Sequence, residues 1–267
     1  MSQGSRSQGS ISSATVPTAP QLNRQQFDKL YDDLILGAGF FEEGNYYDLE
    51  RERYWRSLVH FSTHPLGRAR RVLEIGGGQL GIFAEQMLDC TALVADVSDD
   101  FRASVDKAGV PFEVCNLIED DPQHWHSQFD AVALLEVIEH MPVPPYIILS
   151  KIRSWLAPGG MVFMTTPNLF RLRNMFRMIM GKDFTDHFMM PQPGKGLGHQ
   201  HEYSAAHLEW QMSEAGYQDI SILHAQMGQP GHSTKARLAR KILSPLTMRP
   251  KWREGLVITG RNGPLPA

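Results

Sequence analysis

From residue 71 onward, short and continuously apolar runs alternate with segments of helical periodicity, and this alternation constrains the fold more than any other feature. Five runs are expected to be strands: residues 71–75, 92–97, 112–117, 129–135 and 161–165. Helical segments at 82–88 and 145–156 lie among them. Apolar strands alternating with amphipathic helices form a parallel sheet that is covered on both faces. The pattern therefore predicts a doubly wound α/β fold, with further strand candidates at 219–225 and 255–260.

Composition narrows the class of protein. The chain has 267 residues, of which 42% are hydrophobic and 21% charged, as in a soluble protein of one or two domains. No apolar run reaches the roughly 18 residues of a transmembrane helix. Cys90 and Cys115 both fall in core-like segments, which argues against a disulfide scaffold and for a reducing cytoplasm. A net charge of -3 gives no reason to expect general nucleic-acid binding.

Three regions follow from the distribution of apolar residues. Residues 1–20 hold little to bury and are expected to be a flexible tail, and 21–66 form an N-terminal helical segment or lid. Residues 67–267 form the main domain, with a substrate-facing insertion at about 169–203. The aromatic residues of the N-terminal segment have two open interpretations, core packing or a lid over a site; they are Phe40, Phe41, Tyr46 and Tyr47.

A glycine cluster gives the strongest chemical signal. Glu74 ends the first strand, and Gly76, Gly77 and Gly78 follow where a helix is expected to begin. Glycines there let the backbone approach a ligand and leave helix N–H groups free to bind it. Asp96 ends the second strand twenty residues after Gly76, where a carboxylate can accept the hydroxyls of a ribose. The spacing alone also fits a dinucleotide site, or a tight turn that binds nothing.

Glu74 distinguishes between two possible ligands of such a crevice, a dinucleotide and S-adenosylmethionine. A carboxylate beside the glycines repels a pyrophosphate and attracts an ammonium group. S-adenosylmethionine carries an ammonium and a sulfonium, whereas a dinucleotide carries two phosphates. The crevice is therefore predicted to bind adenosylmethionine.

With these motifs the chain resembles the class I S-adenosylmethionine-dependent methyltransferases over about residues 70–260. The matching segments are VLEIGGG at 72–78, VADV at 94–97, FDAVALLEVIEH at 129–140, LAPGG at 156–160 and TPN at 166–168. The resemblance implies a Rossmann-like sheet of seven strands with an antiparallel last strand. In motif it is most similar to the ubiquinone-pathway O-methyltransferases.

The resemblance also implies roles for individual residues. Those expected to hold the methionine end of the cofactor are Glu74, Gly76, Gly77 and Gly78, with Leu135 and Glu136 closing that side. Asp96 would bind the ribose, Val97 would pack on adenine, and Asn116 and Leu117 would face the adenine edge. Two positions depart from the family pattern: Leu80 stands where a third glycine is usual, and Asn116 replaces an aspartate.

The segment Glu136-x-x-Glu139-His140 follows the fourth strand, at the carboxyl edge where α/β sheets bind ligands. It is also similar to the small-RNA terminal 2′-O-methyltransferases, in which such residues hold a divalent ion. The ligands implied here are Glu136, Glu139, His140 and His201, with His199 as a substitute, for Mg²⁺, Mn²⁺ or Zn²⁺. Two alternatives stay open: His140 or His201 acts as an acid or base without metal, or the segment is structural.

The insertion after the fifth strand carries apolar residues at helical spacing with arginines between them, including Phe176 and Ile179 beside Arg173 and Arg177. It fits an acceptor-binding element, an ordinary cover helix, or a basic amphipathic helix resting on anionic lipid. A basic segment at 235–253 fits either a phosphate-binding surface or a solvated face.

The resulting functional hypothesis is an O-methyltransferase acting on a small hydroxylated metabolite: a phenol, a sugar or a secondary metabolite. One alternative is an RNA 3′-terminal 2′-O-methyltransferase, against which the charge balance counts. The other is a non-catalytic cofactor-binding subunit that regulates a partner.

Overall fold

The computed structural model describes residues 21–40, 46–63, 69–185, 198–228, 238, 241 and 244–263. Seven strands form one sheet: β1 (Arg71–Ile75), β2 (Thr91–Asp96), β3 (Phe112–Val114), β4 (Phe129–Leu135), β5 (Leu156–Pro167), β6 (Gln218–Ala225) and β7 (Gly255–Arg261). Their order is β3-β2-β1-β4-β5-β7-β6, and β7 runs antiparallel to both of its neighbours. The predicted Rossmann-like sheet is confirmed.

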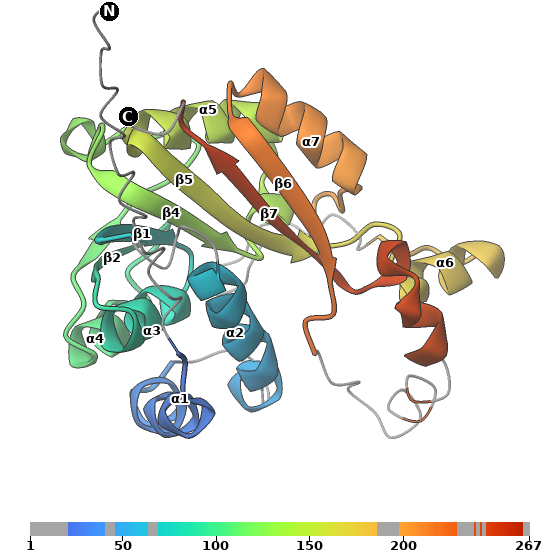
Figure 1. Cartoon of the computed structure of the whole chain (residues 1–267), viewed down its shortest axis with the longest axis horizontal. Helices are drawn as coiled ribbons and strands as arrows, with labels where there is room; N and C mark the ends of the chain where they lie inside the picture. The colour runs from blue at the N-terminus through green and yellow to red at the C-terminus, as the bar shows by residue number, and fades with distance from the viewer. Residues whose placement is uncertain are drawn as a thin grey trace, which may run out of the picture.

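Helices cover both faces of this sheet (Figure 1). One face carries α1 (Arg24–Tyr31), α2 (Tyr46–Thr63), α3 (Gln79–Met87) and α4 (Arg102–Lys107), and the other carries α5 (Pro145–Trp155) and α7 (Ala205–Glu214). The alternation of side chains along β4 separates two cores: Ala131 and Ala133 join the first, and Val132 and Leu134 the second. Because β4 is buried on both faces, its sequence is apolar from Ala131 to Leu135.

The N-terminal segment is part of the first core. Phe27 and Tyr31 of α1 are fully buried and pack on Phe83 of α3, with ring centroids 4.6 and 5.9 Å apart. A π-helical turn (Asp32–Leu36) ends α1. Phe40 and Tyr47 are buried against each other, which favours packing over a lid for these aromatics. Phe41 and residues 1–20 lie outside the described residues.

Two strands differ from their predicted bounds. β5 begins at Leu156 rather than 161, because Leu156 already pairs with Phe129 of β4 and the chain after β7 holds the Gly159-Gly160 segment across a β-bulge. The Gly159 N–H donates to the Asn262 carbonyl at 2.9 Å, and the Asn262 N–H donates to Gly160. β3 ends at Val114 rather than 117, and the chain then turns through Cys115 at the carboxyl edge of the sheet.

Short elements complete the chain; the first of them leads into β4, and the others lie at the carboxyl edge of the sheet. They are the 3-10 turns η3 (Gln123–Trp125), η4 (Ile138–His140), η5 (Ser244–Met248) and η6 (Pro250–Trp252), and the helix α6 (Leu172–Ile179). Ser204 caps α7 by accepting the His207 N–H at 3.2 Å. No helix in the described ranges is both long and apolar enough to cross a bilayer.

Candidate active site

The glycine turn joins β1 to α3. Gly76, Gly77 and Gly78 have φ angles of 90°, 78° and 94°, a region that disfavours residues with a side chain. A Cβ on Gly78 would lie 2.7 Å from Cγ1 of Val94, so the turn also needs the missing side chain for space. The turn therefore brings the first N–H groups of α3 against the end of β2.

Asp96 stands at that end of β2. Its Oδ2 accepts the Gly77 N–H at 2.9 Å, and its Oδ1 accepts the Val97 N–H at 2.6 Å. Burial raises the pKa of Asp96, while these backbone N–H groups act in the opposite direction. Val97 is 65% exposed beside it, an apolar surface available to a flat ring. The carboxylate and the apolar surface are thus adjacent, as a nucleoside requires.

The next strand places Asn116 on the same edge. The Cys115 N–H donates to the Asp96 carbonyl at 2.8 Å, which fixes the turn after β3 against β2. Asn116 is half-buried, and its Oδ1 accepts the Ile118 N–H at 3.0 Å. Leu117 is buried, and Lys151 Nζ donates to its carbonyl at 2.8 Å. The predicted adenine-side residues therefore follow Asp96 along one edge.

Glu74 lies beneath the glycine turn. Its side chain is fully buried beneath the turn, and Oε2 accepts the Gly81 N–H at 2.5 Å. Burial raises the pKa of Glu74 to about 8, although backbone N–H groups of Gly81, Leu80 and Gly78 lower it. The observed partner of Glu74 is the first turn of α3, and a direct contact with a ligand ammonium stays a prediction.

Leu135 and Glu136 end β4 next to β1. Glu136 has a φ of 54°, an unusual backbone conformation for a residue with a side chain, and its N–H donates to the Thr165 carbonyl at 2.9 Å. Its Oε2 lies 3.7 Å from Arg53 of α2. Strained backbone of this kind is found at functional sites more often than elsewhere.

Arg53 is a site residue that the sequence analysis missed. It is buried, its Nε lies 3.1 Å from Glu50, and its guanidinium is over the rings of Tyr46 and Tyr54. Arg53 therefore joins α2 to the end of β4 through Glu136. The only signal in the sequence is a charged pair, Glu50 and Arg53, one helical turn apart on a helix that also carries exposed charges.

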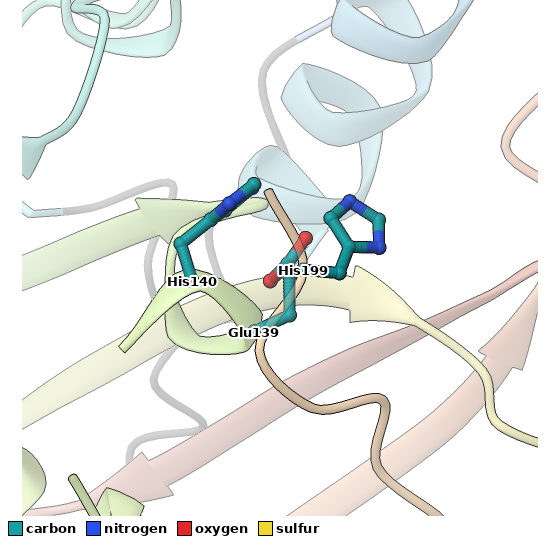
Figure 2. Close-up of side chains that lie close together, drawn as sticks. All are labelled: Glu139, His140 and His199. Atoms are coloured by element: carbon teal, nitrogen blue, oxygen red, sulfur yellow. The ribbon is translucent and has the colours of Figure 1, made fainter. Parts of the chain in front are cut away.

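The side chains of Glu139, His140 and His199 come together just after β4 (Figure 2). One potential ligand atom from each lies within 4.8 Å of the others. Glu139 and His140 belong to η4, and His199 comes from the loop before α7, so the group joins segments sixty residues apart. The two imidazole rings stand edge to face with centroids 4.9 Å apart.

The chemistry of these side chains fits a cation. Glu139 is fully buried, and although Thr166 donates to its Oε2 at 2.9 Å, its Oε1 has no hydrogen-bond partner among the described residues. Burial and the neighbouring Glu136 hold the pKa of Glu139 well above its usual range. His140 Nδ1 donates to the Gly198 carbonyl at 2.8 Å, which leaves Nε2 with its lone pair. A carboxylate and two imidazoles are ligands of divalent metals.

The structure does not bring two of the predicted ligands into this group. The His201 ring packs on Tyr203 and His207, with centroids 4.7 and 5.8 Å away, and burial lowers its pKa. The His201 N–H nevertheless donates to the Glu139 carbonyl at 3.1 Å. Glu136 is directed to Arg53 instead. The substitute ligand, His199, therefore takes the place expected for His201.

A small hollow adjoins Glu136 on the side of α6. It is lined by Glu136, Pro167, Arg171, Met227, Glu254 and Gly255. Arg171 pairs with the buried Glu202, which is also 3.6 Å from His199 Nδ1. The hollow and the histidine group are therefore connected through Glu202, three residues after His199.

Known proteins resemble the chain in sequence and fold. A family model described as a methyltransferase domain matches residues 47–222. A ubiquinone biosynthesis O-methyltransferase of Chromobacterium violaceum is 34% identical over 119 residues, which cover 42% of this chain and 50% of the relative. One from Idiomarina loihiensis is 28% identical, with 57% of this chain and 63% of the relative covered. The chain thus spans between half and two thirds of these relatives.

Among solved structures, a SAM-dependent methyltransferase from Archaeoglobus fulgidus superposes with a TM-score of 0.56 at 15% identity. The match covers 82% of this chain and 100% of that one. At this level of identity the likeness concerns the fold alone.

Proposed function

Because the chain belongs to the methyltransferase-domain family and is an S-adenosylmethionine-dependent methyltransferase, we propose that it methylates a hydroxyl oxygen of a small acceptor. A phenol, a sugar or a hydroxylated secondary metabolite meets this description. The observation that carries the proposal is the Glu139, His140 and His199 group at the carboxyl edge of β4. The printed names of the relatives, O-methyltransferases of ubiquinone biosynthesis, favour oxygen as the acceptor atom.

The cofactor would lie along the edge formed by β1, β2 and β4. Asp96 would accept the ribose hydroxyls, Val97 would cover one face of adenine, and Asn116 would meet its edge. The glycine turn leaves room for the methionine chain, and Leu135 and Glu136 would close it from the β4 side. In this arrangement the sulfonium methyl would face the hollow beside Glu136.

Methyl transfer is an in-line displacement, in which the acceptor oxygen bonds to the methyl carbon as the carbon–sulfur bond breaks. The bonding electrons stay on sulfur, and the protein aligns the two reactants about 3–3.5 Å apart. The hydroxyl proton needs an acceptor. His140 Nε2 is suited to this role, because Nδ1 already donates to Gly198 and the ring is held in one tautomer.

The same residues form the candidate metal site. Glu139, His140 and His199 would hold a divalent ion, which when bound lowers the pKa of a hydroxyl beside it. In either case the histidine group fixes where the hydroxyl must lie. We expect a small acceptor rather than a nucleic acid, since the chain carries a net charge of -3.

The test is transfer of a labelled methyl group from adenosylmethionine to catechol, with and without chelator and added Mg²⁺, Mn²⁺ or Zn²⁺. We expect His140→Gln and His199→Gln to lower the rate about 100-fold or more, with cofactor affinity by calorimetry unchanged. His224→Gln, on β6 outside the group, is the matched control. His201→Gln separates the sequence prediction from the structural group, and we expect it to retain most of the rate.

Three outcomes would overturn parts of the proposal. If His140→Gln and His199→Gln retain full activity, the group is structural and the acceptor lies elsewhere. If the chain binds adenosylmethionine but methylates none of a panel of phenols, sugars and RNA 3′ ends, the regulatory-subunit alternative takes precedence. A rate unaffected by chelation and metal would leave His140 as base and remove the ion.

A further inference from the structure

Helix α6 buries a polar residue and exposes several apolar ones, the reverse of an ordinary surface helix. Asn174 is fully buried beneath it. On the opposite side, Ile179 is 77% exposed and Met180 58%, and Phe176 is also exposed. A single exposed apolar residue needs no explanation, but a whole helical face of them indicates a binding surface.

Buried polar contacts hold α6 in this orientation. Asn174 Nδ2 donates to the Leu169 carbonyl at 3.0 Å and to Glu202 Oε2 at 2.6 Å. Arg171, which precedes the helix, pairs with the other oxygen of Glu202. Rotating the apolar side inward would leave the buried Glu202 without these partners, at a large energetic cost. The outward apolar face is therefore built into the fold.

A second apolar surface lies at the same end of the molecule, on η5 and η6 (Figure 1). Met248 is 79% exposed, and Leu246 is exposed beside it in the sequence. The side chain of Asn168, just before α6, donates to the carbonyls of Lys251 and Arg253 at 2.9 Å each. These bonds tie η6 to the chain entering α6, so that both surfaces move as one unit.

Basic residues surround this apolar end, although the whole chain has a net charge of -3. Residues 169–185 contain four basic side chains and one acidic side chain, Asp183, and residues 244–253 contain three basic and no acidic ones. Arg173 and Lys182 of the first segment and Arg249 and Lys251 of the second are exposed. The end of the molecule that exposes apolar side chains is thus also positively charged.

We propose that α6 together with η5 and η6 binds the surface of an anionic lipid membrane. The apolar side chains would enter the boundary between headgroups and acyl chains, and the arginines and lysines would meet lipid phosphates. The positive charge of this end favours an anionic lipid surface over a second copy of the chain as its partner, because two such ends would repel each other. The inference does not depend on which acceptor is methylated.

The test is flotation of the full chain with vesicles, at low and high salt. One set is phosphatidylcholine alone, and the other is an equal mixture of phosphatidylcholine and phosphatidylglycerol. We expect binding to the anionic vesicles only, weakened by salt, and reduced about tenfold or more in Ile179→Ser. Arg173→Gln should reduce it roughly fivefold. Ile147→Ser on α5 and Arg70→Gln before β1 are exposed controls that should bind like the parent.

Matched thermal melting of the parent and each variant separates lost binding from lost folding. Vesicle binding that is absent, or equal for both vesicle types, or unchanged in Ile179→Ser, overturns the proposal. Concentration-dependent association of the parent that Ile179→Ser abolishes, without vesicle binding, would assign the surface to a second copy instead.

Discussion

At the scale of single residues, the state of Glu74 decides how the glycine turn works. The prediction that Glu74 attracts an ammonium requires an ionised carboxylate facing the ligand. In the structure the carboxyl group is buried under α3, and its pKa is raised to about 8. A neutral Glu74 would hold the turn through the Gly81 N–H and would not repel a phosphate.

This difference predicts a dependence of stability on pH. The pKa of Glu74 is 4.5 for the unfolded chain and about 8 when folded, so between these values only the folded state holds the proton. The stabilisation is complete below pH 4.5 and is lost as the pH rises through 8, by up to about 1.4 kcal/mol per unit. Urea unfolding of the parent and of Glu74→Gln from pH 5 to 8.5 gives two curves of unfolding free energy against pH. The difference between the two curves measures the contribution of Glu74. Parallel curves would mean that Glu74 is ionised when folded.

Residues beside the glycines could be located from the sequence because their positions follow from local geometry. The end of a strand and a glycine turn place Asp96 and Gly77 together whatever the rest of the chain does. The choice between His199 and His201 could not be predicted, since it depends on how the loop before α7 crosses η4. Arg53 was missed for the same reason: its partner Glu136 is 83 positions away.

At the scale of elements, α2 contributes both to the hydrophobic core and to the candidate site. Its apolar side packs Leu58 and Phe61 into the core, while Arg53 reaches Glu50 and the end of β4. Truncating a buried ion pair leaves an uncompensated charge, whereas an exposed pair contributes little. The two arginines Arg53 and Arg56, on one helix, allow these cases to be compared.

We expect Arg53→Met to lower the free energy of unfolding by about 3–5 kcal/mol, because Glu50 and Glu136 lose their cation. Arg56 pairs with Glu52 at 2.8 Å near the surface, and Arg56→Met should cost about 1 kcal/mol or less. Chemical denaturation gives both values, and calorimetry with adenosylmethionine shows whether Glu136 still supports the cofactor. Equal losses in the two variants would contradict the assignment of Arg53 to the site.

The central strands were predictable at this scale because most of their residues are buried and apolar, as in β4 and the second half of β5. Their ends were not. Pro158, Gly159 and Gly160 are typical of a turn, yet backbone hydrogen bonds between Gly159, Gly160 and Asn262 keep this segment in β5. Tertiary pairing thus overrides local preference at this strand end.

At the scale of the whole molecule, the question is whether the N-terminal helices are a lid or part of the core. A lid opens without disturbing the rest of the fold, so its contacts contribute little to global stability. The contacts of α1 are instead those of a core element. Phe27 is fully buried between Trp55 of α2 and Phe83 of α3, with ring centroids 5.1 and 4.6 Å away.

We therefore expect Phe27→Ala to destabilise the entire fold by about 3–5 kcal/mol, as truncation of a core aromatic does. Leu36→Ala, at an exposed position of the same segment, should change stability by about 1 kcal/mol or less. Urea unfolding followed by both tryptophan fluorescence and far-UV circular dichroism measures the effect, and one core implies that the two signals change together. If α1 is instead a lid, Phe27→Ala would leave the global transition in place and alter only the rates of cofactor binding and release. The burial of Phe27 argues for the first outcome, in which α1 cannot leave its place without unfolding the core.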